Sequence, residues 1–207
     1  MAKRNSYALK SNEGNEIFHS WEECQAAIKT HTGVSYKAFA NDDMCRDWFD
    51  GRCPAISPVI NEPGKVIIYT DGSFNAAIPM YGWGFVVILT NDLNECRCHS
   101  EYGGGTNSEL LLQRNVAGEM IAAMKAVQWA SLHGYKTVEL RYDYAGIGKW
   151  PLGTQQVSVG NEYAKTYRDW MRRMADTIDI RYVQIPGHSG DWYNEYADQW
   201  AKKGCQA

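Results

Sequence analysis

Four acidic side chains stand at positions from which they could act together: Asp71, Glu119, Asp143 and Asp198. Asp71 follows the apolar run VIIYT of an expected strand. Asp143 ends a second expected strand, TVELRYD, at the carboxyl edge where open α/β sheets bind their ligands. Glu119 and Asp198 fall in expected helices beside alanines, and such small side chains let a helix lie close to a sheet.

Carboxylates confined together repel one another, and divalent cations remove that repulsion most simply. Oxygen ligands without a cluster of cysteine or histidine favour Mg²⁺ or Mn²⁺ over zinc. Two such ions about 4 Å apart can activate a water and stabilise the leaving oxygen of a phosphodiester. Each acid taken singly would be an ordinary cap or surface charge. The four together, near a Gly-His188-Ser-Gly loop, favour a shared site.

The elements expected around these residues form one sheet with helices packed on it. Expected strands cover 65–74, 81–90, 95–102, 137–143 and 178–185, and expected helices cover 115–133, 144–150, 161–177 and 191–203. Three strands in a meander followed by alternating helices and strands predict an α/β (α+β) fold. The expected architecture is a mixed five-stranded sheet with helices on both faces, in which the first, fourth and fifth strands run parallel.

A smaller module precedes this part of the chain. A hairpin of 6–10 and 16–20, a helix from Ser20 to Lys29, a strand 36–39 and a helix 41–48 make a ββαβα unit over 1–50. Ser20 with Glu23 three residues later is a capping box. Residues 51–64 hold three of the six prolines and no periodicity, which is typical of a linker. Residues 65–207 then form the larger domain.

Composition excludes several classes of protein. The chain has 207 residues, 44% of them hydrophobic and 22% charged, which is typical of a globular protein. Its net charge of −3 does not by itself indicate a nucleic-acid-binding protein. It holds no run of about 18 apolar residues, so no membrane-spanning helix is expected. The start lacks an apolar signal core, and the six cysteines follow no disulfide or metal-finger spacing. These features predict reduced thiols and a cytoplasmic location.

Together the motifs are recognisable. They are Tyr-Thr-Asp71-Gly-Ser, Gly-Glu119-Met-x-Ala-Ala, Tyr-Asp143-Tyr, and Gly187-His188-Ser189-Gly190 with Asn194-Glu195-x-x-Asp198. In order and spacing, residues 65–207 resemble type 1 ribonuclease H. Residues 1–50 resemble the hybrid-binding (viroplasmin-like) module that precedes it in many family members.

The resemblance implies a metal-dependent endoribonuclease that hydrolyses the RNA strand of RNA/DNA hybrids by a two-metal mechanism. Asp71, Glu119, Asp143 and Asp198 would be the catalytic carboxylates and hold two Mg²⁺ ions, with Mn²⁺ as a possible substitute. His188 would be the loop histidine that assists proton transfer and product departure. Asn115 would read the minor groove of the hybrid, while Val116 stands where a second polar residue is usual.

The same resemblance assigns hybrid contacts to Tyr7, Trp21, Tyr36 and Lys37 in the module. Aromatic rings that stack on sugars or bases contribute about 1–3 kcal/mol each. The module holds six basic and eight acidic residues, so its hybrid affinity is expected to be weak and salt-sensitive. Residues 149–162 carry one basic side chain where some family members have a basic protrusion. Binding of the hybrid would therefore depend on the N-terminal module.

Two alternatives stay open at this point. One is another nuclease of the same superfamily, an exonuclease or a resolvase, and the other is a catalytically weak protein that binds hybrids. The attached module disfavours the first, and the presence of all four carboxylates disfavours the second. The expected partner is an RNA/DNA hybrid, with no membrane and a monomeric chain.

Overall fold

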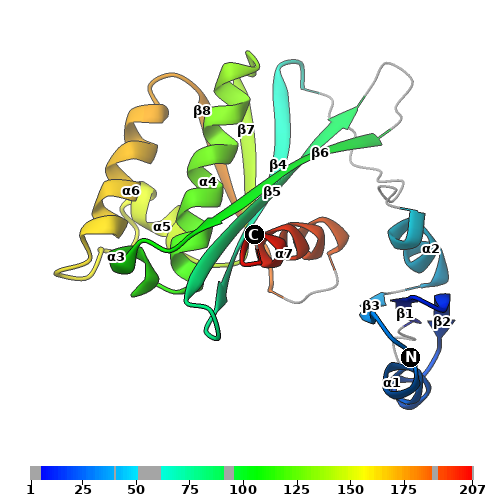
Figure 1. Ribbon diagram of the computed structural model, residues 1–207. Helices are drawn as coiled ribbons and strands as arrows, with labels where there is room; N and C mark the ends of the chain where they lie inside the picture. The colour runs from blue at the N-terminus through cyan, green and yellow to red at the C-terminus, as the bar shows by residue number, and fades with distance from the viewer. Residues whose placement is uncertain (1–5, 40, 51–61, 91–95, 188–190, 207) are drawn as a thin grey trace. The chain divides into compact units, whose positions relative to one another are not determined.

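The computed structural model describes residues 6–39, 41–50, 62–90, 96–187 and 191–206. The chain divides into two compact units, Met1–Ser57 and Pro58–Ala207 (Figure 1). Of the linker predicted at 51–64, residues 51–61 lie outside the described part of the chain.

The first unit is a three-stranded antiparallel sheet with two helices. Its elements are β1 (Ser6–Ser11), β2 (Gly14–Phe18), α1 (Trp21–Thr30), β3 (Ser35–Phe39) and α2 (Asp42–Asp50), with strand order β2-β1-β3. The predicted cap of α1 is present, because the Ser20 hydroxyl accepts a hydrogen bond from the Glu23 backbone N–H at 3.3 Å. Leu9, Cys24 and Ala27 form a small core, as expected for a unit of this size.

The second unit is built on a five-stranded mixed sheet. Its strands are β4 (Lys65–Asn75), β5 (Met80–Thr90), β6 (Cys96–Gly105), β7 (Thr137–Tyr142) and β8 (Asp179–Gln184), in the order β6-β5-β4-β7-β8. The first three are antiparallel neighbours, whereas β4, β7 and β8 are parallel. The predicted meander and the predicted set of parallel strands are both confirmed.

Helices cover both faces of this sheet. They are α3 (Ser108–Leu111), α4 (Asn115–Leu132), α5 (Gly146–Leu152), α6 (Glu162–Met174) and α7 (Trp192–Gly204). Side chains of α4, α5 and α6 join Val66, Ile68 and Leu140 in the main core, while the first turn of α7 packs on Tyr69, which projects from the opposite face. The expected fold class is therefore confirmed. The sequence pattern does not predict α3, a single turn capped by the Asn107 side chain.

The strand β4 extends past Asp71, in agreement with the expected strand 65–74. Asp71 is not at its end, because β4 continues to Asn75 in an antiparallel pair with β5. The parallel pair with β7, however, ends at Tyr69 and Arg141. Asp71 therefore stands just past the last parallel pair, where the sheet opens between β4 and β7.

Three of the cysteines in the described part of the chain, Cys24, Cys45 and Cys205, are buried free thiols. Cys98 is disulfide-bonded, so the prediction of reduced thiols is wrong for this residue, whose spacing in the sequence matched no disulfide framework. Among the described residues, no helix is both long and apolar enough to cross a membrane.

The helix α4 approaches the sheet at glycines. A methyl group on Gly118 would lie 1.9 Å from the backbone oxygen of Gly82 and 2.9 Å from the Cα of Gly72. A methyl group on Gly72 would lie 2.2 Å from the backbone nitrogen of Glu119. Only hydrogen fits at either position, and the contact brings the residue after Gly118 directly against β4.

We expect Gly118→Ala to lower the free energy of unfolding by about 1–3 kcal/mol, because the added methyl group must push α4 off the sheet. Alanine ordinarily stabilises a helix by about 1 kcal/mol relative to glycine. A loss of stability in Gly118→Ala would therefore show that the steric clash outweighs the gain in helix propensity. Chemical denaturation measures it. The control is Gln128→Ala on the exposed side of the same helix, which should be neutral. Stabilisation by Gly118→Ala would contradict the close approach.

Candidate active site

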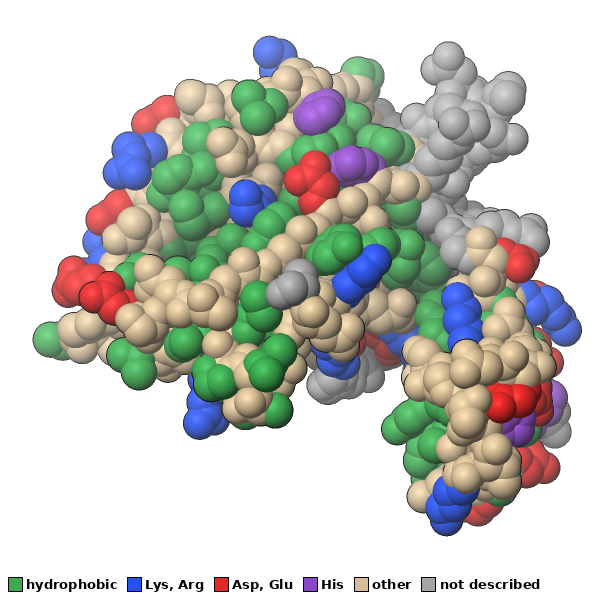
Figure 2. Space-filling view, in the orientation of Figure 1, with side chains coloured by type: hydrophobic (Ala, Val, Ile, Leu, Met, Phe, Trp, Pro, Cys, Tyr) green, Lys and Arg blue, Asp and Glu red, His purple; other side chains and the backbone are tan. Residues whose placement is uncertain are grey.

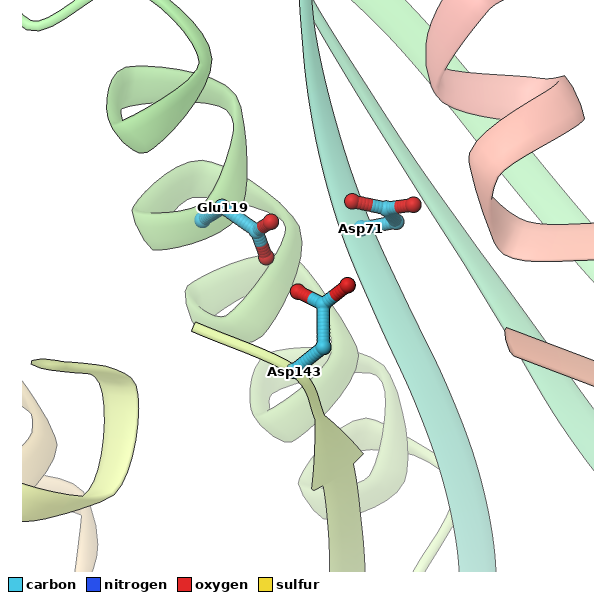
Figure 3. Close-up of side chains that lie close together, drawn as sticks. All are labelled: Asp71, Glu119 and Asp143. Atoms are coloured by element: carbon cyan, nitrogen blue, oxygen red, sulfur yellow. The ribbon is translucent and has the colours of Figure 1, made fainter. Parts of the chain in front are cut away.

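Three of the four predicted carboxylates meet at the carboxyl edge of the parallel strands. Asp71 of β4, Glu119 of α4 and Asp143, directly after β7, each offer an oxygen within 4.8 Å of the others. Figure 3 shows the three side chains turned toward one another from these separate elements. Within the part of the chain that the structure describes, this is the group of acidic or metal-ligating side chains that could hold a metal ion.

Each side chain is held in place by its own element. One oxygen of Asp71 accepts a hydrogen bond from the Gly72 backbone N–H at 2.7 Å. The backbone of Asp143 is tied to β8, since its carbonyl accepts a hydrogen bond from the Gln184 side chain at 3.1 Å. Glu119 lies in the second turn of α4, immediately after the glycine that brings this helix against β4.

Burial makes this cluster strongly unfavourable in its fully ionised form. Asp71 and Glu119 are only 8% and 2% exposed. Desolvation raises the pKa of Asp71 to about 7; Glu119 donates a hydrogen bond that lowers it, and Asp143 and Asp198 raise it by repulsion. Desolvation, followed by repulsion from Asp71, raises the pKa of Glu119 well above its ordinary value.

The cluster fits a divalent cation. The Oε2 atom of Glu119 is buried and has no hydrogen-bond partner among the described residues, which is rare for a carboxylate oxygen. A hard cation would satisfy this oxygen and neutralise the repulsion, and an all-oxygen donor set suits Mg²⁺ or Mn²⁺ rather than zinc.

The fourth predicted carboxylate, Asp198, is not part of the three-carboxylate cluster. It lies on α7 and forms an ion pair with Lys202 one turn later, at 2.7 Å between Nζ and Oδ2. Its charge nevertheless reaches the site, because it raises the pKa of Asp71. The spacing of four residues between Asp198 and Lys202 was available in the sequence as a signal for this pair.

His188 falls in the segment 188–190, which lies outside the described residues. The residue before this segment, Gly187, is close to the site, since a methyl group there would lie 3.2 Å from Oδ2 of Asp143. The residue after it, Asp191, caps α7. The residue before the segment therefore lies beside Asp143, and the residue after it begins the helix that carries Asp198.

The predicted groove reader, Asn115, is the first residue of α4 and is exposed. A methyl group on Gly72 would lie 2.3 Å from its backbone oxygen, so Asn115 sits beside the strand that carries Asp71. Val116 instead packs against the main core. Arg114, exposed and with a positive φ of 51°, precedes them in a backbone conformation that side chains rarely adopt.

In the first unit the structure gathers three of the four predicted hybrid contacts. The ring of Trp21 lies 5.7 Å from that of Tyr7 and 5.5 Å from that of Tyr36, between centroids. Trp21 is 37% exposed and Tyr36 is 51% exposed. Lys37 is not part of this aromatic group, because adjacent strand residues face opposite ways and its ammonium lies 5.9 Å from the ring centroid of Phe39.

Comparison with known proteins identifies both units. Residues 63–206 match the family model described as RNase H, and residues 6–49 match the one described as the ribonuclease H1 N-terminal domain. The chain belongs to the ribonuclease H family. The identification from the sequence as a type 1 ribonuclease H with an N-terminal hybrid-binding module is confirmed, and with it the prediction of an enzyme. This family is metal-dependent, in agreement with the acidic cluster.

Individual relatives cover one or both units. The chain is 29% identical to ribonuclease H of Polaromonas naphthalenivorans over 161 residues, which are 73% of this chain and 94% of that protein. It is 25% identical to human ribonuclease H1 over 258 residues, covering 97% of this chain and 89% of that protein. The fold matches a crystal structure of ribonuclease H1 from Halobacterium salinarum with a TM-score of 0.56, at 19% identity, over 69% of this chain and 98% of that chain.

The raised pKa values predict how the stability of the metal-free protein depends on pH. A carboxyl whose pKa is higher in the folded than in the unfolded chain destabilises the fold once it ionises. The free energy of unfolding should therefore fall as the pH rises from about 4, the unfolded value, through about 7. Glu119→Gln removes one repelling charge and should make this fall smaller.

Thermal unfolding in EDTA between pH 5 and 8 measures this difference between the two proteins. Glu162→Gln, which changes an exposed carboxylate on α6, is the matched control and should keep the wild-type slope. A wild-type slope in Glu119→Gln as well would show that the carboxylates do not repel one another in the folded chain.

The Lys202 ammonium competes with any cation for Asp198. If Asp198 takes part in cation binding, Lys202→Met should tighten the binding of Mn²⁺ by about twofold, the scale of an exposed ion pair on a helix. Titration calorimetry measures the affinity. Lys203→Met is the control, because Lys203 loses the same charge from the same helix but lies over the rings of Tyr102 and Trp200. Equal effects of both changes would argue against direct competition.

Proposed function

We propose that this chain hydrolyses the RNA strand of RNA/DNA hybrids as an endonuclease, with its chemistry at Asp71, Glu119, Asp143 and Asp198. The observation that carries the proposal is the buried three-carboxylate cluster with one unpartnered Glu119 oxygen. Carboxylates that repel one another in a buried position are stabilised when they bind a divalent cation. Such a cation can promote hydrolysis of a phosphodiester, which is the kind of bond that the ribonuclease H family cleaves.

Two Mg²⁺ ions, with Mn²⁺ as a substitute, are the proposed cofactors. When bound, they supply a polarised water and neutralise the charge that develops on the phosphate oxygens. Asp71, Glu119 and Asp143 would hold the ions, together with Asp198 if its ion pair with Lys202 opens. His188 moves a proton at the leaving oxygen and assists product departure, and its position between the ends of β8 and α7 supports this role.

The hybrid is the proposed partner. One solved structure of the same fold, at 20% identity and a TM-score of 0.51, is a ribonuclease H1 in complex with an RNA/DNA hybrid. Asn115 would contact the minor groove beside Glu119, where the 2′-hydroxyls that distinguish RNA from DNA are displayed. The exposed rings of Trp21 and Tyr36 offer a stacking surface in the first unit.

The catalytic unit has few positively charged side chains near α5 with which to bind a polyanion. From residue 149 to residue 162 the chain carries Lys149 and ends in the acid Glu162, so electrostatic grip at this place is weak. We assign most of the hold on long hybrids to the first unit. A monomeric state completes the proposal, since a single chain supplies all four carboxylates. The cytoplasmic location stays a prediction from the sequence.

The proposal is tested with Asp143→Asn, which keeps the size of the side chain but removes the charge that holds a cation. We expect the rate of hybrid cleavage to fall by about 10²-fold or more, with the fold intact. The assay uses a labelled RNA strand alone, paired with RNA, or paired with DNA, in Mg²⁺, in Mn²⁺ or in EDTA. Asp169→Asn, at a carboxylate paired with Arg168 on α6, is the matched control and should cleave normally.

An RNA segment flanked by DNA within one strand distinguishes the remaining alternatives. An endonuclease cuts inside the RNA segment, whereas an exonuclease must begin at the DNA ends. Binding of the hybrid without any cut would favour the catalytically weak binding protein. Cleavage by Asp143→Asn at a tenth of the wild-type rate or better would disprove the site assignment.

Trp21→Ala in the full-length chain tests the role of the first unit. Loss of one stacked base is worth about 1–3 kcal/mol, so KM for long hybrids should rise about fivefold or more while kcat is unchanged. Trp21→Phe should keep KM close to the wild-type value, because an aromatic ring remains at this position. An unchanged KM at moderate salt would mean that the aromatic group of Tyr7, Trp21 and Tyr36 does not hold the hybrid.

A further inference from the structure

A second polar feature lies on the sheet face that carries the catalytic aspartates. Tyr69 and Arg141 are register partners across the parallel strands β4 and β7. Each stands two positions before a catalytic residue, Asp71 or Asp143. Because side chains alternate along a strand, Tyr69, Asp71 and Arg141 project from the same face of the sheet, and Asp143 directly follows the end of β7.

Tyr69 and Arg141 are joined by hydrogen bonds into a chain that ends on α7. A guanidinium N–H of Arg141 donates to the Tyr69 hydroxyl at 2.6 Å, and its Nε donates to Glu139 at 2.7 Å. Glu139 is held in turn by Lys65 at 2.7 Å. The Tyr69 hydroxyl, having accepted from Arg141, donates its own proton to Oδ2 of Asp191 at 3.3 Å.

Asp191 uses its other oxygen to begin α7. Its Oδ1 accepts hydrogen bonds from the backbone N–H groups of Tyr193 at 3.0 Å and Asn194 at 3.2 Å. The ring of Tyr69 also stacks on that of Tyr193, with 5.3 Å between centroids. Tyr69 therefore holds the first turn of α7 in two ways, through its hydroxyl and through its ring.

The position of the fourth carboxylate of the proposed site depends on where this turn lies. Asp198 lies two turns beyond Asp191 on the same helix. We propose that Arg141, Tyr69 and Asp191 form a positioning chain that fixes the start of α7, and thereby Asp198, relative to Asp71 and Asp143. This inference rests on the proposed function for its effect on catalysis.

The arrangement suits positioning rather than general stability. Tyr69 is 1% exposed, so its hydroxyl cannot turn to water and must take the partners that the strands and α7 offer. The Nε and Nη2 atoms of Arg141 are held by Glu139, two positions earlier on β7, while its Nη1 atom donates to the Tyr69 hydroxyl. The positioning chain thus links β4 and β7, which lead to Asp71 and Asp143, to the helix α7.

Tyr69→Phe tests the chain, since it removes the hydroxyl and keeps the stack on Tyr193. One lost hydrogen bond shifts an equilibrium by about fivefold. We expect kcat on hybrids to fall about fivefold with little change in KM, and amide hydrogen exchange at Tyr193 and Asn194 to quicken by a similar factor. The control is Tyr167→Phe, an equally buried tyrosine whose hydroxyl donates to the Ile147 carbonyl at 2.8 Å. It should lower the Tm without changing kcat or exchange in α7.

A second variant shows whether Tyr69 acts through Asp191. Asp191→Ser keeps a hydroxyl that can cap α7 but removes the acceptor that reaches Tyr69. In this background Tyr69→Phe should have no further effect on kcat or on exchange in α7. The inference is overturned if Tyr69→Phe behaves like Tyr167→Phe, or if its effects persist undiminished in Asp191→Ser. Hydrogen exchange needs no substrate, so a wild-type chain that fails to cut hybrids would refute the proposed function and leave this test standing.

Discussion

The repulsion among three carboxylates, of which Asp71 and Glu119 are buried, is the interaction around which the catalytic unit is organised. Desolvation and mutual repulsion raise the pKa values of Asp71 and Glu119, and one oxygen of Glu119 has no partner among the described residues. A protein that holds such a cluster gives up stability in the absence of a cation. The fold must therefore be rigid enough at this edge of the sheet to keep the three side chains together.

That rigidity comes from close contact between helices and sheet. Glycines at 72 and 118 let the backbone of α4 touch β4 and β5, and Gly82 and Gly84 let α7 approach from the opposite face. With both helices at this distance, small backbone shifts are resisted by direct atomic contact. The positioning chain from Arg141 to Asp191 adds a directional link between the strands and the start of α7.

The two units divide the work of recognition and chemistry. The second unit contains every predicted carboxylate but little positive charge near α5. The first unit contributes an aromatic group with Trp21 and Tyr36 partly exposed, on a module whose acidic residues outnumber its basic ones. Stacking is less sensitive to net charge than phosphate contacts are, which makes aromatic contact the physically consistent route to hybrid binding for a module of this composition.

The sequence by itself determined the elements other than α3, their order and the identity of the acidic residues, because apolar periodicity, caps and turn residues are local signals. It could not decide that the parallel pair of β4 and β7 ends before Asp71, that Asp198 lies outside the three-carboxylate cluster, or that Lys37 lies apart from the aromatic group of Trp21. These depend on register, on helix rotation and on which face a strand residue takes, and each is set by contacts between segments far apart in the chain. The hydrogen bond from Tyr69 to Asp191 joins residues 122 positions apart, and only the tertiary structure brings them within reach.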